Sequence, residues 1–371
     1  MQPLTLGRIA RDLVVLTGAS PGASVAVGRK EDGTWQFGVG SAGRRSLGRP
    51  GACLTSTPFD LASVTKPLVA ATAARLTQRG DFDLDAPIGS LLDAARQSLS
   101  ASTPAKLLLA HRSGLAAYLP LYRCLVAGRS VCRQQMLAEA ASAVRPDCLG
   151  VPADRGFPPL YSDLGYLLLG EALCRSSGME LDELVAREVT GPLGLALGSA
   201  RQWIRSGISF IHEVAPTEIV AWRGGELAGV VHDENAWAFA GHGIAGHAGL
   251  FGTAESVARF GAAMLDALMC QSEWLEPEMA HELVRPRPGG TLRAGFDGKA
   301  PSGSAAGDLA GPATFGHLGF TGTSLWCDPD AGLVTVLLSN RVHPTRAHAA
   351  IRQARPRVHD ALTAAARGSS V

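Results

Sequence analysis

The chain has 371 residues, of which 46% are hydrophobic and 18% charged, and its formal net charge is +1 at pH 7. A chain of this length forms two lobes more often than a single core. Its balanced charge excludes the strongly basic surface of proteins that bind polyanions, so we expect no nucleic-acid partner. The seven cysteines are scattered and form no Cys-x-x-Cys pair, which disfavours a disulfide framework and a zinc site and fits a reducing compartment.

The N-terminal segment, residues 1–16, carries Arg8, Arg11 and Asp12 among apolar residues at the period of an amphipathic helix. This pattern differs from the uninterrupted apolar core of a signal peptide. No apolar run elsewhere is long enough to span a membrane. We therefore expect a cytoplasmic protein without a membrane partner, with export by another route left open.

Hydrophobic periodicity and turn residues predict the remaining elements. Strand patterns occupy residues 23–28 and 35–39, on either side of a turn that contains Asp32 and Gly33, and residues 324–327 and 333–338. Helical patterns occupy residues 63–79, 103–109, 131–143, 163–175, 182–189 and 345–366. Two segments rich in Gly, Pro, Ala and Ser are either lids or disordered: residues 152–159 and 285–311.

Strands at both ends of the chain around a mostly helical middle predict an α/β (α+β) fold. The two termini build one antiparallel sheet flanked by helices, and an all-helical lobe is inserted between them. We expect residues 1–79 and 220–371 to form the sheet lobe and residues 80–219 to form the helical lobe, with approximate boundaries.

A serine and a lysine stand three residues apart at the start of the first long helix, a spacing at which the two side chains can interact. Ser63 and Lys66 stand at i and i+3, which places both side chains on one helix face. Lysine is scarce in this chain, and Lys66 lies between apolar segments where a solvated lysine would be out of place. A desolvated lysine can have its pKa lowered enough to take a proton from serine, so Ser63 is a candidate nucleophile and Lys66 its activator.

Two further clusters carry polar groups next to predicted helices and strands. Tyr161 precedes Ser162 and Asp163, either of which can cap the following helix; a tyrosine near a lysine can also exist partly as phenolate and relay a proton. Residues 315–323 are rich in glycine and enter the strand at 324–327, where a backbone N–H could face a developing oxyanion.

These clusters, in this order, resemble the penicillin-recognising serine hydrolases, the family of class C β-lactamases, D-alanyl-D-alanine carboxypeptidases and related esterases. The resemblance covers nearly the whole chain. Besides Ser63 and Lys66, its landmarks are residues 108–115 (Leu-Leu-Ala-His-Arg-Ser-Gly-Leu), 161–165 (Tyr-Ser-Asp-Leu-Gly), 191–195 (Gly-Pro-Leu-Gly-Leu) and 248–254 (Ala-Gly-Leu-Phe-Gly-Thr-Ala).

The resemblance implies a β-lactamase/transpeptidase-like fold, with the site between the α/β sandwich and the helical lobe. It implies that Ser63 attacks an ester or amide carbonyl while Lys66 and Tyr161 move protons. It also implies that the N–H groups of Ser63 and Phe320 form the oxyanion hole. The further substrate-binding residues it suggests are Asp163, His317, Gly319 and Thr321.

Two departures from the family pattern bear on the substrate. The β-lactam-active members have Tyr-x-Asn, whereas this chain has Asp163, a carboxylate that cannot donate a hydrogen bond when ionised. They have Lys-Thr-Gly where this chain has His317-Leu318-Gly319. An imidazole in place of the lysine should leave the site largely uncharged near neutral pH, which favours substrates without a carboxylate.

The sequence thus predicts a serine hydrolase acting through a Ser63 acyl-enzyme on a small ester or amide, most simply a carboxylesterase. The alternatives are an acyltransferase, a β-lactamase, a D-alanyl-D-alanine carboxypeptidase or D-aminopeptidase, and a non-catalytic binding protein on the same fold. We expect no cofactor. The histidines His232, His242 and His247 lack the spacing of metal ligands, so we expect no metal site.

Overall fold

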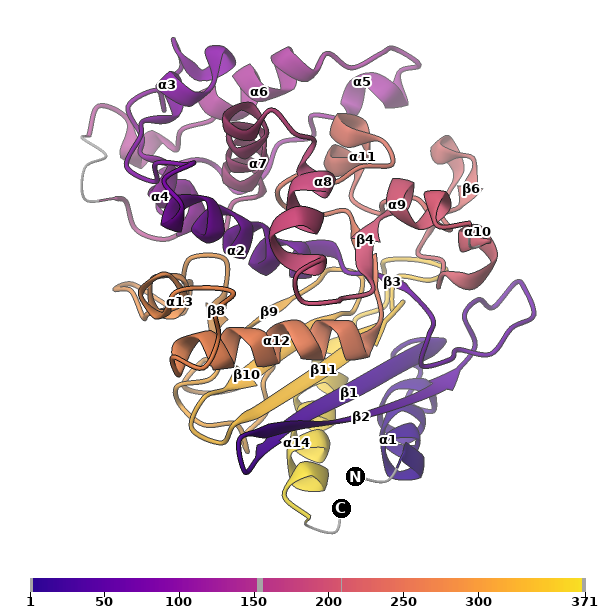
Figure 1. The fold of residues 1–371 in the computed structure, drawn as a ribbon. Coiled ribbons are helices and arrows are strands. Elements are labelled where there is room, and N and C mark those ends of the chain that lie inside the picture. The colour runs from indigo at the N-terminus through magenta and orange to yellow at the C-terminus, as the bar shows by residue number, and fades with distance from the viewer. Residues whose placement is uncertain (1–2, 152–155, 208, 369–371) are drawn as a thin grey trace.

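A computed structural model describes residues 3–151, 156–207 and 209–368 (Figure 1). Its main sheet has the strand order β2-β1-β11-β10-β9-β8, and every neighbouring pair is antiparallel. The strands are β1 (Gly22–Glu31), β2 (Thr34–Gly43), β8 (Asp297–Gly298), β9 (Phe315–Leu318), β10 (Ser324–Asp328) and β11 (Leu333–Ser339). Ser24 of β1 pairs with Leu338 of β11, so the two ends of the chain meet inside the sheet. The expected antiparallel sheet and fold class are confirmed.

The first hairpin is longer than the sequence predicts. Only Asp32 and Gly33 separate β1 from β2, and both have positive φ, 47° and 79°. Such a two-residue turn matches the twist of the strands on either side, so pairing continues up to Glu31 and Thr34.

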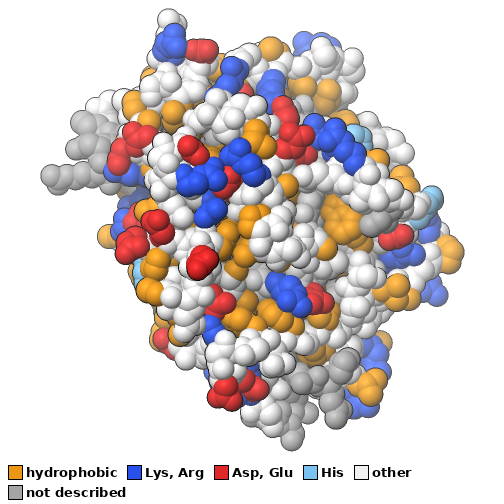
Figure 2. Space-filling model, viewed as in Figure 1, with side chains coloured by type: hydrophobic (Ala, Val, Ile, Leu, Met, Phe, Trp, Pro, Cys, Tyr) orange, Lys and Arg blue, Asp and Glu red, His pale blue; other side chains and the backbone are white. Residues whose placement is uncertain are grey.

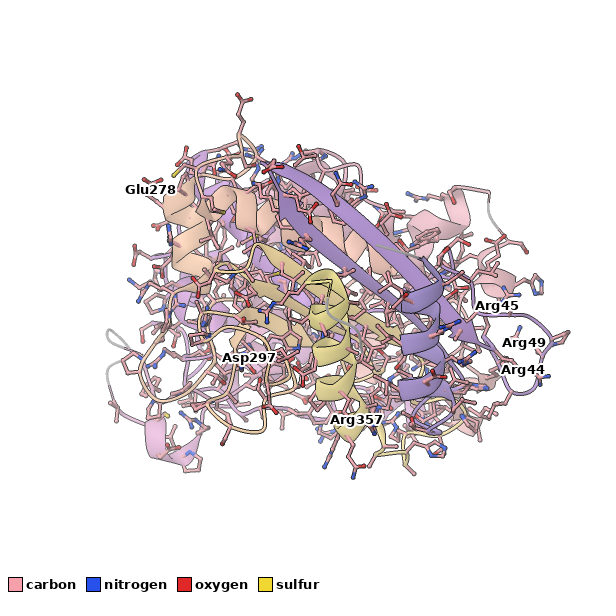
Figure 3. The ribbon with its side chains drawn as sticks, turned by 90° about the horizontal axis from the view of Figure 1, so that it is seen from below. Arg44, Arg45, Arg49, Glu278, Asp297 and Arg357 are labelled. Carbon is pink, nitrogen blue, oxygen red and sulfur yellow. The ribbon has the colours of Figure 1, made fainter. Side chains whose placement is uncertain are left out.

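Helices cover both faces of the sheet (Figures 1 and 3). The helix α12 (Ala254–Leu268) packs on one face against β1, β10 and β11. The helices α1 (Pro3–Ala10) and α14 (Ile351–Ala366) lie side by side on the other. α12 is not among the expected elements, and α14 begins later than predicted because Arg346, before it, is held by Glu218 in a turn.

The helical lobe lies above the sheet in Figure 1. The helices expected in this lobe are present: α4 (Ala105–Leu109), α6 (Arg133–Ser142), α7 (Asp163–Ser177) and α8 (Leu181–Val185). The expected helix before it, α2 (Thr65–Gln78), is also present and packs against α7, α8 and α13. Shorter helices accompany them or border the sheet: α3 (Ile88–Leu91), α5 (Arg123–Val126), α9 (Ala200–Arg205), α10 (Phe210–Glu213), α11 (Glu234–Ala240) and α13 (Pro277–Val284). Of the two caps that the sequence allows for α7, the structure has Ser162, whose side chain accepts a hydrogen bond from the Gly165 N–H at 3.1 Å.

A small sheet in the order β3-β7-β4 joins segments distant in sequence: β3 (Phe59–Asp60), β7 (Leu250–Gly252) and β4 (Leu197–Ser199). A separate two-stranded hairpin, formed by β5 (Ile219–Val220) and β6 (Gly225–Glu226), lies between β4 and β7 in the sequence. Residues 285–311 are irregular except for β8, yet Ala294 and Phe296 within them are buried. Part of the other Gly/Pro-rich segment, residues 152–155, lies outside the described residues, and the lobe boundaries at 79/80 and 219/220 remain a prediction.

None of the helices in the described part of the chain is both long and apolar enough to cross a lipid bilayer. On the face shown in Figure 2, basic and acidic side chains are interspersed, and apolar side chains lie between them.

Candidate active site

Ser63 stands at a sharp transition from strand to helix. After β3, the chain passes through a short 3-10 helix (Ala62–Val64) into α2. Ala62 has a φ of 48°, a left-handed conformation that is unfavourable for a residue with a side chain. Asp60 stabilises this turn, since its carboxylate accepts hydrogen bonds from the N–H groups of Ala62 at 2.8 Å and His232 at 2.7 Å.

Lys66 lies one helical turn beyond Ser63 and is completely buried. Its ammonium group donates to three acceptors: Ser63 Oγ at 3.0 Å, Asp163 Oδ1 at 2.7 Å and the His247 carbonyl at 3.2 Å. Burial acts to lower the pKa of Lys66, but the Asp163 carboxylate and Tyr161 outweigh it and raise the pKa above its usual range. The expected lowering is therefore wrong for the resting site: Lys66 is an ammonium ion paired with Asp163.

Tyr161 lies between two histidine rings above the lysine. Its ring stacks on His111 at a centroid distance of 4.7 Å and tilts against His317 at 5.8 Å. The Lys66 ammonium is 4.6 Å from the ring centroid. Burial raises the pKa of Tyr161 despite the opposing effect of Lys66, so the resting side chain is a neutral phenol and not the partial phenolate that the sequence suggests.

His317 lies on β9 and contributes an uncharged imidazole to the site. Burial, together with the nearby Lys66 ammonium, lowers the pKa of His317 to about 3. The contact of Nδ1 with the Leu318 carbonyl at 2.7 Å requires Nδ1 to carry the proton, because a carbonyl only accepts. The other ring nitrogen, Nε2, is thus an acceptor.

Two backbone amides belong to residues that line the cleft with the nucleophile, those of Ser63 itself and of Phe320. Within the described residues, the N–H groups of Ser63 and Phe320 donate to no protein acceptor. Free backbone donors at these positions are what an oxyanion hole requires. Gly319 lets the chain approach closely here: a Cβ atom there would lie 1.9 Å from Thr323 Oγ1 and 2.5 Å from the Leu61 carbonyl oxygen.

The turn at residues 319–323 is tied directly to the segment before Ser63. The hydroxyl of Thr321 donates to the Asp60 carbonyl at 2.7 Å, and that of Thr323 donates to the Leu61 carbonyl at 2.9 Å. Thr321 is buried and does not line the cleft, so its expected contact with substrate is corrected to a positioning role. The two hydroxyls fix the Phe320 amide relative to the nucleophile.

A cleft of about 940 Å³ opens in front of Ser63, between β9 and the helical lobe. The structure brings six of the expected residues to its wall: Ser63, Tyr161, Asp163, His317, Gly319 and Phe320. The sequence analysis missed a second group in the wall, the arginines 341, 346, 352 and 355. A signal was present, because residues 341–357 contain five arginines and no acidic residue.

Two of the three histidines weighed as metal ligands each contact a carboxylate. His247 Nε2 lies 2.9 Å from Asp233 Oδ1, and His232 Nε2 lies 3.3 Å from Glu218 Oε2. Burial acts to raise the pKa of Asp233, but His247 outweighs it and holds that pKa below its usual range. Among the residues that the structure describes, no three His, Cys, Asp or Glu side chains are grouped as metal ligands would be.

Comparisons with known proteins agree with this architecture. A putative D-alanyl-D-alanine carboxypeptidase of Salmonella agona (strain SL483) is 27% identical over 333 residues, which are 83% of this chain and 75% of the relative. EstCE1, described as a hydrolase with promiscuous acyltransferase activity, superposes with a TM-score of 0.71 at 20% identity, and the match covers 97% of this chain and 99% of that one. A penicillin-binding protein homologue from Caulobacter crescentus gives a TM-score of 0.69 at 19% identity, with 96% of each chain covered.

The two structural neighbours share the fold at low identity. The family model named Beta-lactamase matches residues 10–359, which is almost the entire sequence. This extent confirms the resemblance read from the sequence, and the chain therefore belongs to the beta-lactamase family.

Proposed function

We propose that this protein is a serine hydrolase that forms an acyl-enzyme on Ser63 and acts on small ester or amide substrates, most readily as a carboxylesterase. The observation that carries the proposal is the contact of Ser63 Oγ with a buried lysine at 3.0 Å, beside two free backbone amides. A binding protein on this fold has no use for a nucleophile held in this way. Asp163 and His317, in place of the amide and lysine of β-lactam-active relatives, disfavour β-lactams.

Acylation begins with the proton shared by Lys66 and Asp163. Their atoms are 2.7 Å apart in a largely desolvated site, where transfer of the proton to Asp163 removes two opposite charges together. Neutral Lys66 then takes the hydroxyl proton of Ser63 as Oγ bonds to the substrate carbonyl carbon. The carbonyl oxygen gains negative charge, which the amides of Ser63 and Phe320 stabilise.

Collapse of this intermediate breaks the bond to the leaving alcohol or amine. The leaving atom receives a proton from Lys66 or from the Tyr161 phenol, which is protonated at rest and lies against the lysine. Water then attacks the acyl-enzyme by the same steps in reverse roles. One of its protons returns to Ser63, and the acid leaves with its new oxygen, so the balance is ester or amide plus water to acid plus alcohol or amine.

A fluorophosphonate probe with intact-mass detection tests the nucleophile. Wild type should gain one adduct, and Ser63→Ala should gain none and lose at least about a thousandfold in ester turnover. Ser90→Ala is a matched control, because Ser90 is also at a helix start but lies on the surface. Labelling that persists in Ser63→Ala would overturn the assignment.

A chromogenic panel of acyl esters, D-amino-acid amides and a cephalosporin tests the substrate class. The carboxylesterase proposal requires esters to be turned over fastest. Cephalosporin turnover faster than that of any simple ester would instead identify a β-lactamase, and labelling without turnover of any substrate would favour the binding protein.

A further inference from the structure

Lys66 has its third hydrogen-bond acceptor in a glycine-rich segment. Its ammonium group donates to the His247 carbonyl at 3.2 Å, the longest of its three contacts and at the long end of the usual N–H···O range. Residues 241–249 contain four glycines, the residue type that restricts the backbone least. The position of this carbonyl therefore depends on contacts with the rest of the protein.

The His247 side chain supplies such a contact. The residue is only 2% exposed, and its Nε2 lies 2.9 Å from Asp233 Oδ1. Asp233, with its lowered pKa, is ionised and only accepts, so Nε2 carries the proton of this hydrogen bond. The other ring nitrogen, Nδ1, is buried and has no partner in the described structure. Among the described residues, Asp233 is thus the polar group that fixes the orientation of the ring.

Asp233 is itself held in place from both sides, at the start of α11. Before it, the His232 N–H donates to Asp60 Oδ2 at 2.7 Å. After it, the Asn235 side chain donates to the Leu119 carbonyl at 2.8 Å. The carboxylate that holds the His247 ring therefore belongs to a segment that is tied to two other parts of the protein.

The third acceptor matters most when Lys66 acts as a base. A neutral amine has two N–H donors and one lone pair. With one N–H on the His247 carbonyl and the other on Asp163, which still accepts when protonated, the lone pair is directed at Ser63 Oγ. If the carbonyl withdraws, the amine is free to turn about its Cε–Nζ bond. The lone pair then loses its alignment with the serine hydroxyl, and proton transfer slows.

We propose that Asp233 and His247 form a positioning pair for Lys66. Asp233 holds the His247 ring, and the ring holds the carbonyl that orients the lysine amine. The proposal rests on the hydrolase function proposed above. It adds two residues whose side chains act through Lys66 and not on the substrate.

Two other roles for Asp233 have to be separated from this one. Its side chain is 25% exposed and lines the cleft, which is what a direct contact with substrate requires. It is also the N-cap of α11, where Oδ1 accepts from the Ala236 N–H at 2.8 Å. A substrate contact acts on KM, and a cap acts on stability, whereas a positioning role acts on kcat and on the rate of Ser63 labelling.

Asp233→Ser and Asp233→Asn make this separation. Asparagine and serine are both good N-cap residues, so both variants keep the cap of α11. The asparagine oxygen still reaches His247, but the serine oxygen is one bond nearer to the backbone and falls short of the ring. We expect Asp233→Ser to lower kcat for a neutral ester and the labelling rate about tenfold, with KM changed by less than about twofold. Asp233→Asn should stay within about threefold of wild type.

His247→Gln and His247→Asn test the same contact from its other side. The glutamine amide nitrogen reaches about as far as Nε2, whereas that of asparagine reaches only as far as Nδ1. We expect His247→Asn to lose about tenfold in kcat and in labelling rate, and His247→Gln less than about threefold. Adding Asp233→Ser to His247→Asn should cause no further loss, because the two residues act as one unit. The histidine pair decides the question if Asp233→Ser does not fold.

Thr253→Ala is the matched control for loss of a helix cap. Thr253 caps α12 and lies outside the cleft wall. Its loss should lower the urea midpoint and leave kcat and the labelling rate unchanged. Urea midpoints of all variants also show which of them are folded under the assay conditions.

Several results would overturn the positioning role. They are an Asp233→Ser variant that keeps kcat within about twofold of wild type, a rise in KM alone, equal losses in Asp233→Ser and Asp233→Asn, and losses that add in the double variant. Each of these leaves the hydrolase function standing, since wild-type Ser63 is still labelled. If wild type is not labelled and hydrolyses no ester, the hydrolase function itself is wrong.

Discussion

The replacement Asp163→Asn is the most informative perturbation of this site. It keeps the size of the side chain and removes the only carboxylate that the described structure places against Lys66. The lysine is fully buried, whereas the Asp163 side chain is 22% exposed. The variant therefore leaves an ammonium ion buried without its countercharge, while the Ser63 hydroxyl and the His247 carbonyl continue to accept its hydrogen bonds.

Breaking one side of a buried ion pair lowers the free energy of unfolding by about 3–5 kcal/mol. The two remaining acceptors and the partial exposure of Asp163 place this case near or below the lower limit, about 2–3 kcal/mol at pH 7. In wild type, the pKa of Lys66 is raised on folding, so its contribution is complete below the unfolded pKa and is lost only as pH rises through the folded value.

The variant should have the opposite pH dependence. Once the carboxylate is absent, burial dominates and the folded pKa of Lys66 falls below its unfolded value. Stability of the variant then rises with pH between these two pKa values, by up to about 1.36 kcal/mol per pH unit. The difference from wild type should be largest near pH 7 and should narrow toward pH 9.5.

Urea unfolding of both proteins at pH 7, 8 and 9.5 measures this difference in the free energy of unfolding. The rate of Ser63 labelling as a function of pH is a second measurement, because it reports the fraction of Lys66 that is neutral. Labelling of the variant should rise at a lower pH than that of wild type, because neutral Lys66 is reached sooner. Asp93→Asn is the control: its ion pair with Arg96 is exposed, and its loss should change stability by less than about 0.5 kcal/mol. A difference below 0.5 kcal/mol that stays constant with pH would refute the reasoning.

Four other changes have definite expected outcomes. Lys66→Arg should abolish labelling of Ser63 by the probe, since arginine does not give up its proton, and full activity would exclude the base role. Tyr161→Phe should lower kcat about a hundredfold in ester assays; activity within a few fold would assign the residue to packing. Gly319→Ala should lose both activity and at least about 2 kcal/mol in urea unfolding, because its Cβ would overlap the Leu61 carbonyl and Thr323, and normal activity would show that the turn adapts. Thr321→Val should lower kcat more than it raises KM, and an effect on KM alone would return Thr321 to substrate binding.

The sequence predicted those parts of the site that local spacing determines. Ser63 and Lys66 share a helix face whatever the rest of the fold does, and the period of the strands identified the sheet. The protonation state of Lys66 could not be predicted from the sequence, because two of its hydrogen-bond acceptors lie 97 and 181 residues away in the chain. The Thr321 hydroxyl is turned toward β3, where it donates to the Asp60 carbonyl. These two residues are 261 positions apart, so no local pattern reveals the contact.

Two misses had signals that could have been used. The helix α12 begins after Thr253, whose side chain caps it, and has Glu255 in its first turn, which is a common helix start. The arginines of the cleft occur in a stretch without acidic residues, and Arg352 and Arg355 have helical spacing. What the sequence does not give is their position, because the place of α14 depends on its packing against β11 and α1, which are distant from one another in the chain.

The pairing of β1 with β11 has a consequence for synthesis of the protein. Leu333 follows Glu31 by about 300 residues, which a ribosome adds in about 15–60 s. Throughout that time the first hairpin has an edge without its partner, a form of chain prone to aggregate and recognised by chaperones. The oxyanion turn and α14 are also made late, so a nascent chain that already exposes Ser63 has no complete cleft around it. Hydrolytic activity should thus appear only after the last strand has joined the sheet.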